Sequence, residues 1–336
     1  MTPPVDIDRL SAFIAEHITG GRCETVFVEP VAGGQSNPTY FITTDGRQLV
    51  LRSQPRGELL PSAHAIDREY RVMSALAQSD VPVPAVLCYS EDRSITGTPF
   101  YLMERVEGRV YRNAALEGVS PKERRLMYLS AAETLAKLHC VDWKGVGLGD
   151  YGRSGDYFGR QLNRWSRQWL ASKTREIPEI DRLIAWLPSH VPDSDHTAIA
   201  HGDFRLGNLI FHPTEPHVAA VLDWELSTLG HPLADLGFFC IPYHTLANEY
   251  GGVMDLDAEA LGIPDEREIV DHYRHAVGDD EPLRPFHVAF ALFRFAVIFA
   301  GVEARAAQGN AADADAASVG WLAEAMAKRG CEAARI

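Results

Sequence analysis

Paired cysteines and a basic charge excess are both missing from this sequence of 336 residues. Its five cysteines are odd in number and far apart, without a C-x-x-C pair; they are Cys23, Cys88, Cys140, Cys240 and Cys331. This spacing favours reduced thiols over a disulfide framework or a zinc site. Acidic residues outnumber basic ones by 46 to 32, giving a formal net charge of −14. A polyanionic backbone would be repelled by this charge, so we expect no nucleic-acid partner.

Targeting segments and long apolar runs are also lacking. The first ten residues, MTPPVDIDRL, contain no basic region followed by an apolar stretch, so no signal peptide is predicted. The most apolar run, Val288 to Val302, is short for a membrane span and carries Arg294 near its middle. We therefore expect a buried helix, no membrane contact and a cytoplasmic location.

The order of the predicted elements indicates an α+β fold with two parts. Strand-like runs broken by turn residues dominate up to about Gly108, among them Thr25 to Val31, Tyr40 to Thr44, Gln48 to Arg52 and Phe100 to Val106. Helical patterns dominate afterwards, including Pro121 to His139, Tyr157 to Ser172, Pro285 to Gln308 and Ala312 to Lys328. Strands followed by helices are typical of α+β proteins. We predict a first domain over 1–106 and a second over 107–336.

Two short segments carry side chains suited to phosphoryl transfer. Asp203 occupies a turn, where a carboxylate can orient an acceptor hydroxyl and take its proton. Asn208 can supply an amide oxygen to magnesium, and Asp223, at the end of an apolar run, can supply a carboxylate. Glu225 could add a second carboxylate on the same side if the chain stays extended there. The segments read HGDFRLGNLIF (201–211) and VLDWE (221–225).

These segments resemble the catalytic and metal-binding motifs of the aminoglycoside-phosphotransferase and choline-kinase superfamily, H-G-D-F-x-x-x-N-L followed by L-D-W-E. They are similar to the pair H-R-D-x-x-x-x-N and D-F-G of protein kinases. The resemblance implies a bilobal, protein-kinase-like fold and an ATP- and Mg²⁺-dependent kinase. It makes Asp203 the catalytic residue and Asn208 and Asp223 the metal ligands. Asp235 matches a family aspartate that commonly braces the catalytic loop, although a metal contact stays open.

The front half must then supply the nucleotide site. Glycines and polar residues between two strand candidates could bring backbone N–H groups to phosphates, although a plain hairpin turn explains them equally well; they are Gly33, Gly34, Ser36 and Asn37. At the end of the next strand, Arg52 stands where most of the superfamily has a phosphate-binding lysine, with Glu69 as its expected partner. Arginine keeps the charge but is not equivalent to lysine. Backbone groups of Glu104 and Val106, at the expected hinge, are candidates to bind adenine.

A narrower resemblance covers nearly the whole chain. The segments GQSNPTY (34–40), LLPSAH (59–64), DREYR (67–71), GTPFY (97–101) and VEGR (106–109) are similar to phosphotransferase domains associated with acyl-CoA dehydrogenase-like proteins. The implied acceptor is the hydroxyl of a hydroxyacyl-CoA or hydroxy acid. Arg160, Arg164 and Arg167 share one helix face by their spacing and could meet CoA phosphates; a solvated basic face is the simpler explanation.

Other functions stay open. The acceptor could be an aminoglycoside, a choline-like alcohol or a sugar, and GTP could replace ATP. The substitution at Arg52 also suits a pseudokinase that binds a nucleotide or a partner protein, although Asp203, Asn208 and Asp223 oppose it. The sequence does not determine the oligomeric state.

Overall fold

The computed structural model describes residues 5–21, 23, 25–31, 37–56, 65–307 and 319–336. The chain forms two compact units, the first made of 1–107 with 219–225, and the second of 108–218 with 226–336. The short segment that returns to the first unit carries Asp223, so the second unit is interrupted where we expected it to be continuous.

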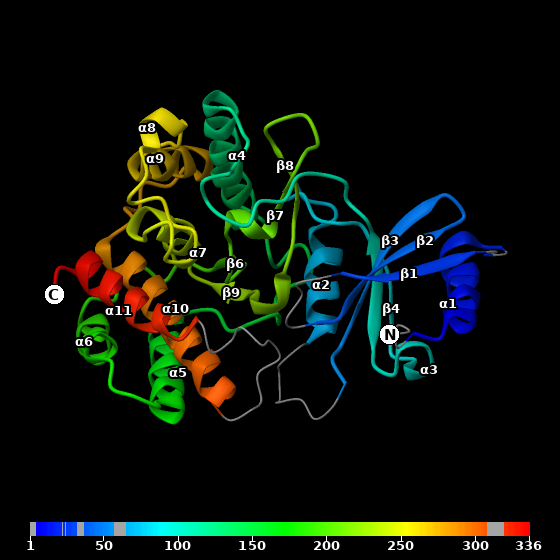
Figure 1. The fold of residues 1–336 in the computed structure, drawn as a ribbon, viewed down its shortest axis with the longest axis horizontal. Helices are drawn as coiled ribbons and strands as arrows, with labels where there is room; N and C mark the ends of the chain where they lie inside the picture. The colour runs from blue at the N-terminus through cyan, green and yellow to red at the C-terminus, as the bar shows by residue number, and fades with distance from the viewer. Residues whose placement is uncertain (1–4, 22, 24, 32–36, 57–64, 308–318) are drawn as a thin grey trace. The chain divides into compact units, whose positions relative to one another are not determined.

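The first unit is built on one antiparallel sheet with the strand order β1-β2-β3-β5-β4 (Figure 1). Its strands are β1 (Val26–Pro30), β2 (Thr39–Thr44), β3 (Arg47–Ser53), β4 (Val86–Ser90) and β5 (Phe100–Glu104). Its helices are α1 (Ile7–Ile14), continued by a π-helical turn over Ala15–Thr19, α2 (Ile66–Leu76) and α3 (Arg93–Thr96). The predicted strands are confirmed, whereas β4 was not anticipated.

The core of this unit lies between α1 and the sheet. Apolar side chains of alternate strand residues point to the same face and meet the apolar side of α1; they include Leu10, Ile14, Ile42, Leu49, Leu51 and Leu102. Helix α2 contacts β4 and β5. These contacts place Glu69 of α2 against the sheet that carries Arg52 on β3.

The second unit is mainly helical. Its helices are α4 (Pro121–His139), α5 (Tyr157–Ser172), α6 (Pro178–Trp186), α7 (Pro232–Phe239), α8 (Ala258–Leu261), α9 (Glu266–Val277), α10 (Pro285–Ala307) and α11 (Trp321–Ala334). Its short strands are β6 (Ala198–Ala200), β7 (Leu209–Phe211) and β9 (Thr228–Gly230), with β6 paired to β9. Single turns of 3₁₀ helix cover Leu187–Ser189, Leu206–Asn208 and Ile241–His244. The returning segment 219–225 of the first unit contains most of strand β8 (Val218–Val221) and of a further 3₁₀ turn, Trp224–Leu226.

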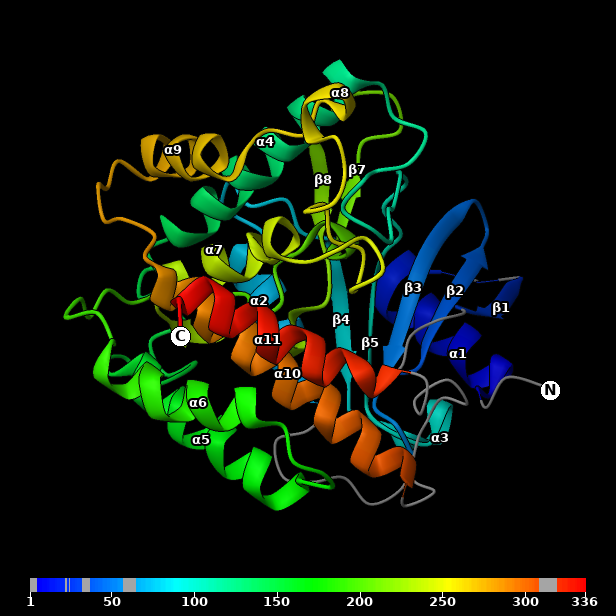
Figure 2. The same cartoon turned by 60° about the vertical axis from the view of Figure 1, so that its left-hand side comes forward.

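Helix α10 is the central helix of this unit and packs against α5, α7 and α11; its course beside α11 is clear in Figure 2. It is the one helix in the described residues that is long and apolar enough to cross a membrane, but 83% of its most apolar window is buried inside the protein. The expected buried helix is therefore confirmed. The helices predicted over 121–139 and 157–172 are also confirmed, and α4 begins where Ser120 caps it by accepting the Glu123 N–H.

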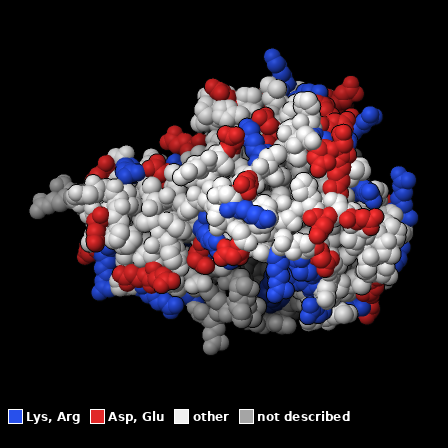
Figure 3. Space-filling view, turned by 180° about the vertical axis from the view of Figure 1, so that it is seen from behind, with Lys and Arg blue, Asp and Glu red and all other residues white. Residues whose placement is uncertain are grey.

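Acidic side chains do not gather in one patch on the face of the molecule seen in Figure 3. On the face drawn in Figure 3, Asp and Glu side chains are interspersed with Lys and Arg side chains. Ion pairs between neighbouring exposed side chains, such as Lys137 with Glu133, accompany this mixing. Such exposed pairs contribute little stability.

Candidate active site

The loop between β6 and β7 carries the first predicted motif, His201 to Asn208. Gly202 has a φ of 82°, and a Cβ atom on it would lie 2.6 Å from the backbone oxygen of Leu226. Glycine is therefore required here for both its conformation and its small size. His201 is fully buried, and its Nδ1 accepts the N–H of Asp203 at 3.2 Å. His201 thus packs in the interior and hydrogen-bonds to the backbone of its own loop.

Asp235, in the first turn of α7, holds this loop by its backbone. One carboxylate oxygen accepts the N–H of His201 at 2.6 Å and the other accepts the N–H of Gly202 at 2.8 Å. Its side chain is buried and also lies 3.4 Å from Nε2 of His139. Burial alone would raise the pKa of Asp235, but hydrogen bonds and charge from His139 and the Gly202 amide lower it below its ordinary value. With both oxygens bonded to the loop, Asp235 has a supporting geometry and not that of a metal ligand.

A second support comes from Arg294 in the middle of α10. Its guanidinium group is buried and donates a hydrogen bond to the backbone oxygen of Gly202. The guanidinium also lies 5.6 Å from the ring centre of Trp165 on α5, which is a cation–π distance. Sequence reasoning missed this role, although a single arginine within an apolar helix was a signal for it, because a buried charge needs a partner.

The loop brings Asp203 and Asn208 together. The side-chain amide of Asn208 donates to the Asp203 carboxylate at 2.7 Å and to the Asp203 backbone oxygen at 2.8 Å. Because its nitrogen faces Asp203, the Asn208 carbonyl oxygen is the atom left for a cation. Arg205, another residue that sequence reasoning missed, places its Nε 3.4 Å from the same carboxylate. Asp203 is therefore held in one orientation from two sides.

In the first unit, three charged side chains meet. Nε of Arg52 lies 2.9 Å from a Glu69 carboxylate oxygen, and its Nη2 lies 3.0 Å from a carboxylate oxygen of Asp223. Burial disfavours the charge of Arg52, but the carboxylates of Glu69 and Asp223 raise the pKa of the guanidinium above its ordinary value. The predicted partnership of Arg52 with Glu69 is present, and Asp223 joins it.

Two further side chains hold Glu69, which is buried. Asn37 donates to one carboxylate oxygen at 2.6 Å, and the buried Tyr101 hydroxyl donates to the other at 3.0 Å. Burial raises the pKa of Glu69, whereas Arg52 and these hydrogen bonds lower it; the outcome is above the ordinary value. Sequence reasoning assigned Asn37 to phosphate binding and did not single out Tyr101. Gly33, Gly34 and Ser36 lie outside the described residues.

The backbone around Asp223 differs from the extended chain that our prediction for Glu225 required. Asp223 has a φ of 66°, a left-handed conformation that aspartate tolerates better than most residues. Residues Trp224–Leu226 then form a 3₁₀ turn. The spacing argument that placed Glu225 beside Asp223 on one side of a strand therefore fails, because side chains two apart share a face only in extended chain.

At the expected hinge, the backbone N–H groups of Glu104 and Val106 differ in whether they already have a hydrogen-bond partner. The N–H of Glu104 donates to the backbone oxygen of Ala85 at 2.9 Å, so only its carbonyl could serve a base. Its side chain pairs with Arg47 at 2.5 Å. Among the described residues, the Val106 N–H has no hydrogen-bond partner.

The three arginines of α5 make local contacts only. Arg160 donates to the backbone oxygen of Arg153 at 2.7 Å, and Arg167 lies 3.4 Å from that of Asn163. Arg164 is exposed and lies 5.3 Å from the ring centre of Trp165. No carboxylate of the described residues forms an ion pair with any of them, so their charges remain available to an anion.

A small pocket opens beside the loop that carries His201 to Asn208, within the second unit. Its lining combines Arg112, Arg205 and Gly207 with apolar and aromatic side chains that include Phe238, Phe239, Tyr250 and Phe295. The guanidinium of Arg205 lies 5.6 Å from the ring centre of Tyr250. No aspartate or glutamate of the described residues lines this pocket.

Known proteins share both the sequence and the fold. The sequence model of the phosphotransferase enzyme family (APH) matches residues 28–275. Acyl-CoA dehydrogenase family member 10 of Mus musculus is 47% identical over 300 residues, which cover 88% of this chain and 28% of that protein. A crystal structure from Ralstonia eutropha, provisionally named an aminoglycoside phosphotransferase, is 44% identical with a TM-score of 0.89, covering 98% of both chains. Choline kinase from Cryptosporidium parvum shares the fold at 11% identity and a TM-score of 0.67, covering 98% of this chain and 96% of that one.

The chain spans less than half the length of the curated relatives that it matches. The family match covers most of the sequence, and the solved structures confirm the expected protein-kinase-like α+β fold. This chain therefore belongs to the phosphotransferase enzyme family and is a small-molecule kinase.

Proposed function

We propose that this kinase transfers the γ-phosphoryl group of ATP to the hydroxyl of an anionic acceptor with an apolar part, best represented by a hydroxyacyl-CoA or a hydroxy acid. The observation that carries the proposal is a pocket of about 40 Å³ beside the loop that holds Asp203. It is lined by Arg112, by Arg205, which also pairs with Asp203, and by several aromatic rings, but by no carboxylate of the described residues.

The chain's own residues suit each part of the reaction. The carboxylate of Asp203, held by Asn208 and Arg205, orients the acceptor hydroxyl and takes its proton. The acceptor oxygen forms a bond to the γ-phosphorus while the bond from that phosphorus to the bridging oxygen breaks, and ADP leaves. In-line transfer of this kind relies on positioning and on charge stabilisation.

Several residues that the sequence singled out have chemistry suited to a nucleotide and its metal. Asn208 and Asp223 offer hard oxygen donors, the ligand type that Mg²⁺ prefers, so the residues fit this metal. The bound metal would neutralise charge on the phosphates. Arg52 is the candidate to contact phosphate, and the Val106 N–H is the candidate to bind the base.

The charge of the pocket favours this acceptor class over aminoglycosides. An aminoglycoside carries several positive charges, which Arg112 would repel, whereas the charge of Arg205 is shared with the Asp203 carboxylate. A carboxylate or a CoA phosphate would instead be attracted by Arg112. The unpaired arginines of α5 and the likeness to acyl-CoA dehydrogenase family member 10 agree with an acyl-CoA acceptor.

An acceptor screen tests the proposal. The protein is incubated with ATP and magnesium, and ADP release is followed with hydroxyacyl-CoA esters, free hydroxy acids, kanamycin, choline and glucose. We expect the anionic hydroxylated acceptors to accelerate ADP release and Asp203→Asn to remove that acceleration. Arg112→Gln should raise the KM for the acyl-CoA ester more than it changes kcat. Faster turnover with kanamycin or choline than with any anionic acceptor would refute the proposal.

A further inference from the structure

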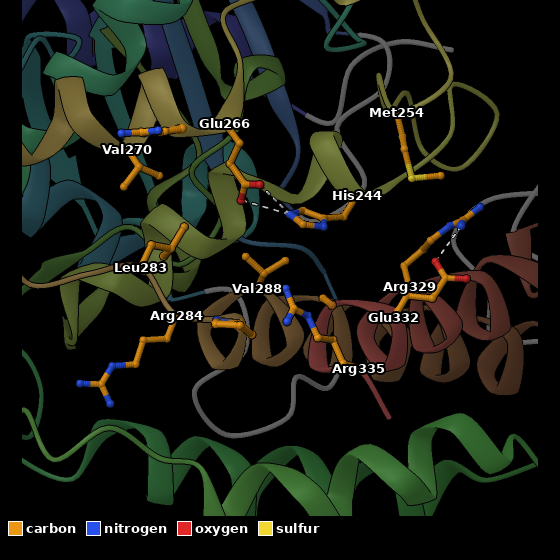
Figure 4. Close-up of a pocket in the computed structure, with 13 residues that line it drawn as sticks. His244, Met254, Glu266, Val270, Leu283, Arg284, Val288, Arg329, Glu332 and Arg335 are labelled. Carbon is orange, nitrogen blue, oxygen red and sulfur yellow. Dashed lines mark hydrogen bonds and ion pairs between the residues drawn. The ribbon is translucent and has the colours of Figure 1, made fainter.

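A second cavity lies among the C-terminal helices, with a volume of about 590 Å³ (Figure 4). Its walls come from the segment around His244, the beginnings of α9 and α10, and the end of α11. It shares no lining residue with the catalytic loop or with the pocket beside Asp203. Its volume is in the range of sites that bind drug-sized molecules, roughly 300–1,000 Å³.

The lining is basic although the protein is acidic. Four arginines and His244 line the cavity, against two glutamates. Both glutamates are already paired, since Glu266 lies 3.0 Å from Nε2 of His244 and Glu332 lies 2.8 Å from Nη1 of Arg329. The negative charges of both glutamates are thus already paired with basic side chains of the same lining.

Two arginines remain without such a partner. Neither the Arg284 nor the Arg335 guanidinium makes an ion pair or hydrogen bond with any residue that the structure describes. Figure 4 shows Arg335 extending toward Val288 and His244, whereas Arg284 points away from them. Arg335 is therefore the cation directed into the cavity.

The backbone of Arg335 is unusual. It follows α11 in the left-handed conformation with a φ of 58°, and its N–H caps the carbonyls of Cys331 and Glu332. Glycine is the residue that prefers this position at a helix end. An arginine here costs some local stability, and its side chain supplies the charge to the cavity.

The remaining lining is largely apolar. Met254, Val270, Leu283 and Val288 contribute hydrocarbon surface facing the same space. A ligand that fits both features carries one anionic group that pairs with Arg335 and a hydrocarbon part that packs on these side chains. A ligand with only one of these parts would leave either the arginine or the apolar lining without a partner.

We propose that this cavity is a binding site for a small amphipathic anion, a carboxylate or phosphomonoester with a hydrocarbon chain, separate from the catalytic site. The proposal does not depend on which acceptor the kinase phosphorylates. The shared chemistry is one anionic head and one apolar tail.

Calorimetric titration of the full chain tests the site with octanoate, octyl phosphate and octanol. We expect saturable binding of at least one anion, with octanol roughly tenfold weaker because it lacks the charge that Arg335 pairs with. The comparison of octanoate with octyl phosphate identifies which anionic head is preferred. Saturating ATP with magnesium should leave the affinity unchanged; competition would place the probe in the catalytic site and refute a separate one.

Two variants locate the binding. Arg335→Gly should weaken the binding of the anion roughly tenfold. The melting temperature of this variant should stay equal or rise, since glycine suits the left-handed position. Arg93→Gln removes one exposed positive charge of the first unit and serves as the matched control, with unchanged affinity expected. Equal affinity of the parent and Arg335→Gly, equal binding of octanol and the anions, or no saturable binding of either anion would overturn the proposal.

Discussion

The loop of Asp203 and Asn208 in the second unit and the charged cluster of the first unit are held by different means. Around the loop, Asp235 and Arg294 bind backbone atoms of His201 and Gly202. In the cluster, Arg52, Glu69 and Asp223 bind one another by their side chains. A loop fixed through its backbone keeps its path when most of its side chains change, whereas a cluster fixed by charge depends on every member. The two regions should therefore respond differently to substitution.

The largest expected effect separates chemistry from structure in the loop. Asp203→Asn keeps the shape and the contact with Asn208 but removes the base, so kcat should fall by about a thousandfold, within the usual contribution of such groups. The melting temperature should change little because the loop backbone remains bound to Asp235. Steady-state kinetics and a thermal melt check both parts. A kcat within threefold of the parent would remove Asp203 from the mechanism.

Arg52 tests the dependence of the cluster on charge. Arg52→Ala leaves Glu69 buried without its ionic partner, so the free energy of unfolding should fall by about 3–5 kcal/mol. Arg52→Lys keeps the charge and should lose much less, while the KM for ATP rises if the guanidinium contacts phosphate. Urea unfolding and ATP kinetics measure the two effects. Equal stability of the alanine variant and the parent would show that the cluster is not held by charge.

Asp235 tests the dependence of the loop on its brace. In Asp235→Asn, an N–H donor replaces one of the two carboxylate oxygens that accept the His201 and Gly202 N–H groups. The lost hydrogen bond should cost about 1–3 kcal/mol. The folded-state pKa of Asp235 is lowered, so the stability that it contributes is complete above its unfolded pKa of about 3.9 and is lost as the pH falls through the folded value.

The difference in unfolding free energy between the parent and Asp235→Asn should therefore be constant from neutral pH to about pH 5 and shrink at more acidic pH. Urea titrations at several pH values measure it, with Asp80→Asn as an exposed control. A difference that grew on acidification would contradict the assigned sign.

The patterns of the sequence predicted the fold because they act over short distances. Apolar spacing gave the helices over 121–139 and 157–172, and strand-like runs broken by turn residues gave β2 and β3. Strand β4 was missed because Pro82 and Pro84 obscured the pattern before it. The prediction for Glu225 depended on an extended backbone, and local sequence did not reveal the left-handed turn at Asp223.

Sequence also singled out the loop that contains Asp203 and Asn208. These residues are only five positions apart, so a single turn of the chain brings their side chains into contact. It did not identify Arg294 or Tyr101 as supports, because each reaches its partner from a helix or strand distant in the chain.

The sequence by itself determined the kinase family, the order of the elements and the residues suited to the chemistry. Only the tertiary structure decided that Asp223 joins Arg52 and Glu69, that Arg294 helps to hold the loop, and that Arg335 faces a basic cavity. The physical reason is the range of the interactions: propensity and periodicity act between neighbours in the chain. Charge pairing and burial act between residues that meet only after folding.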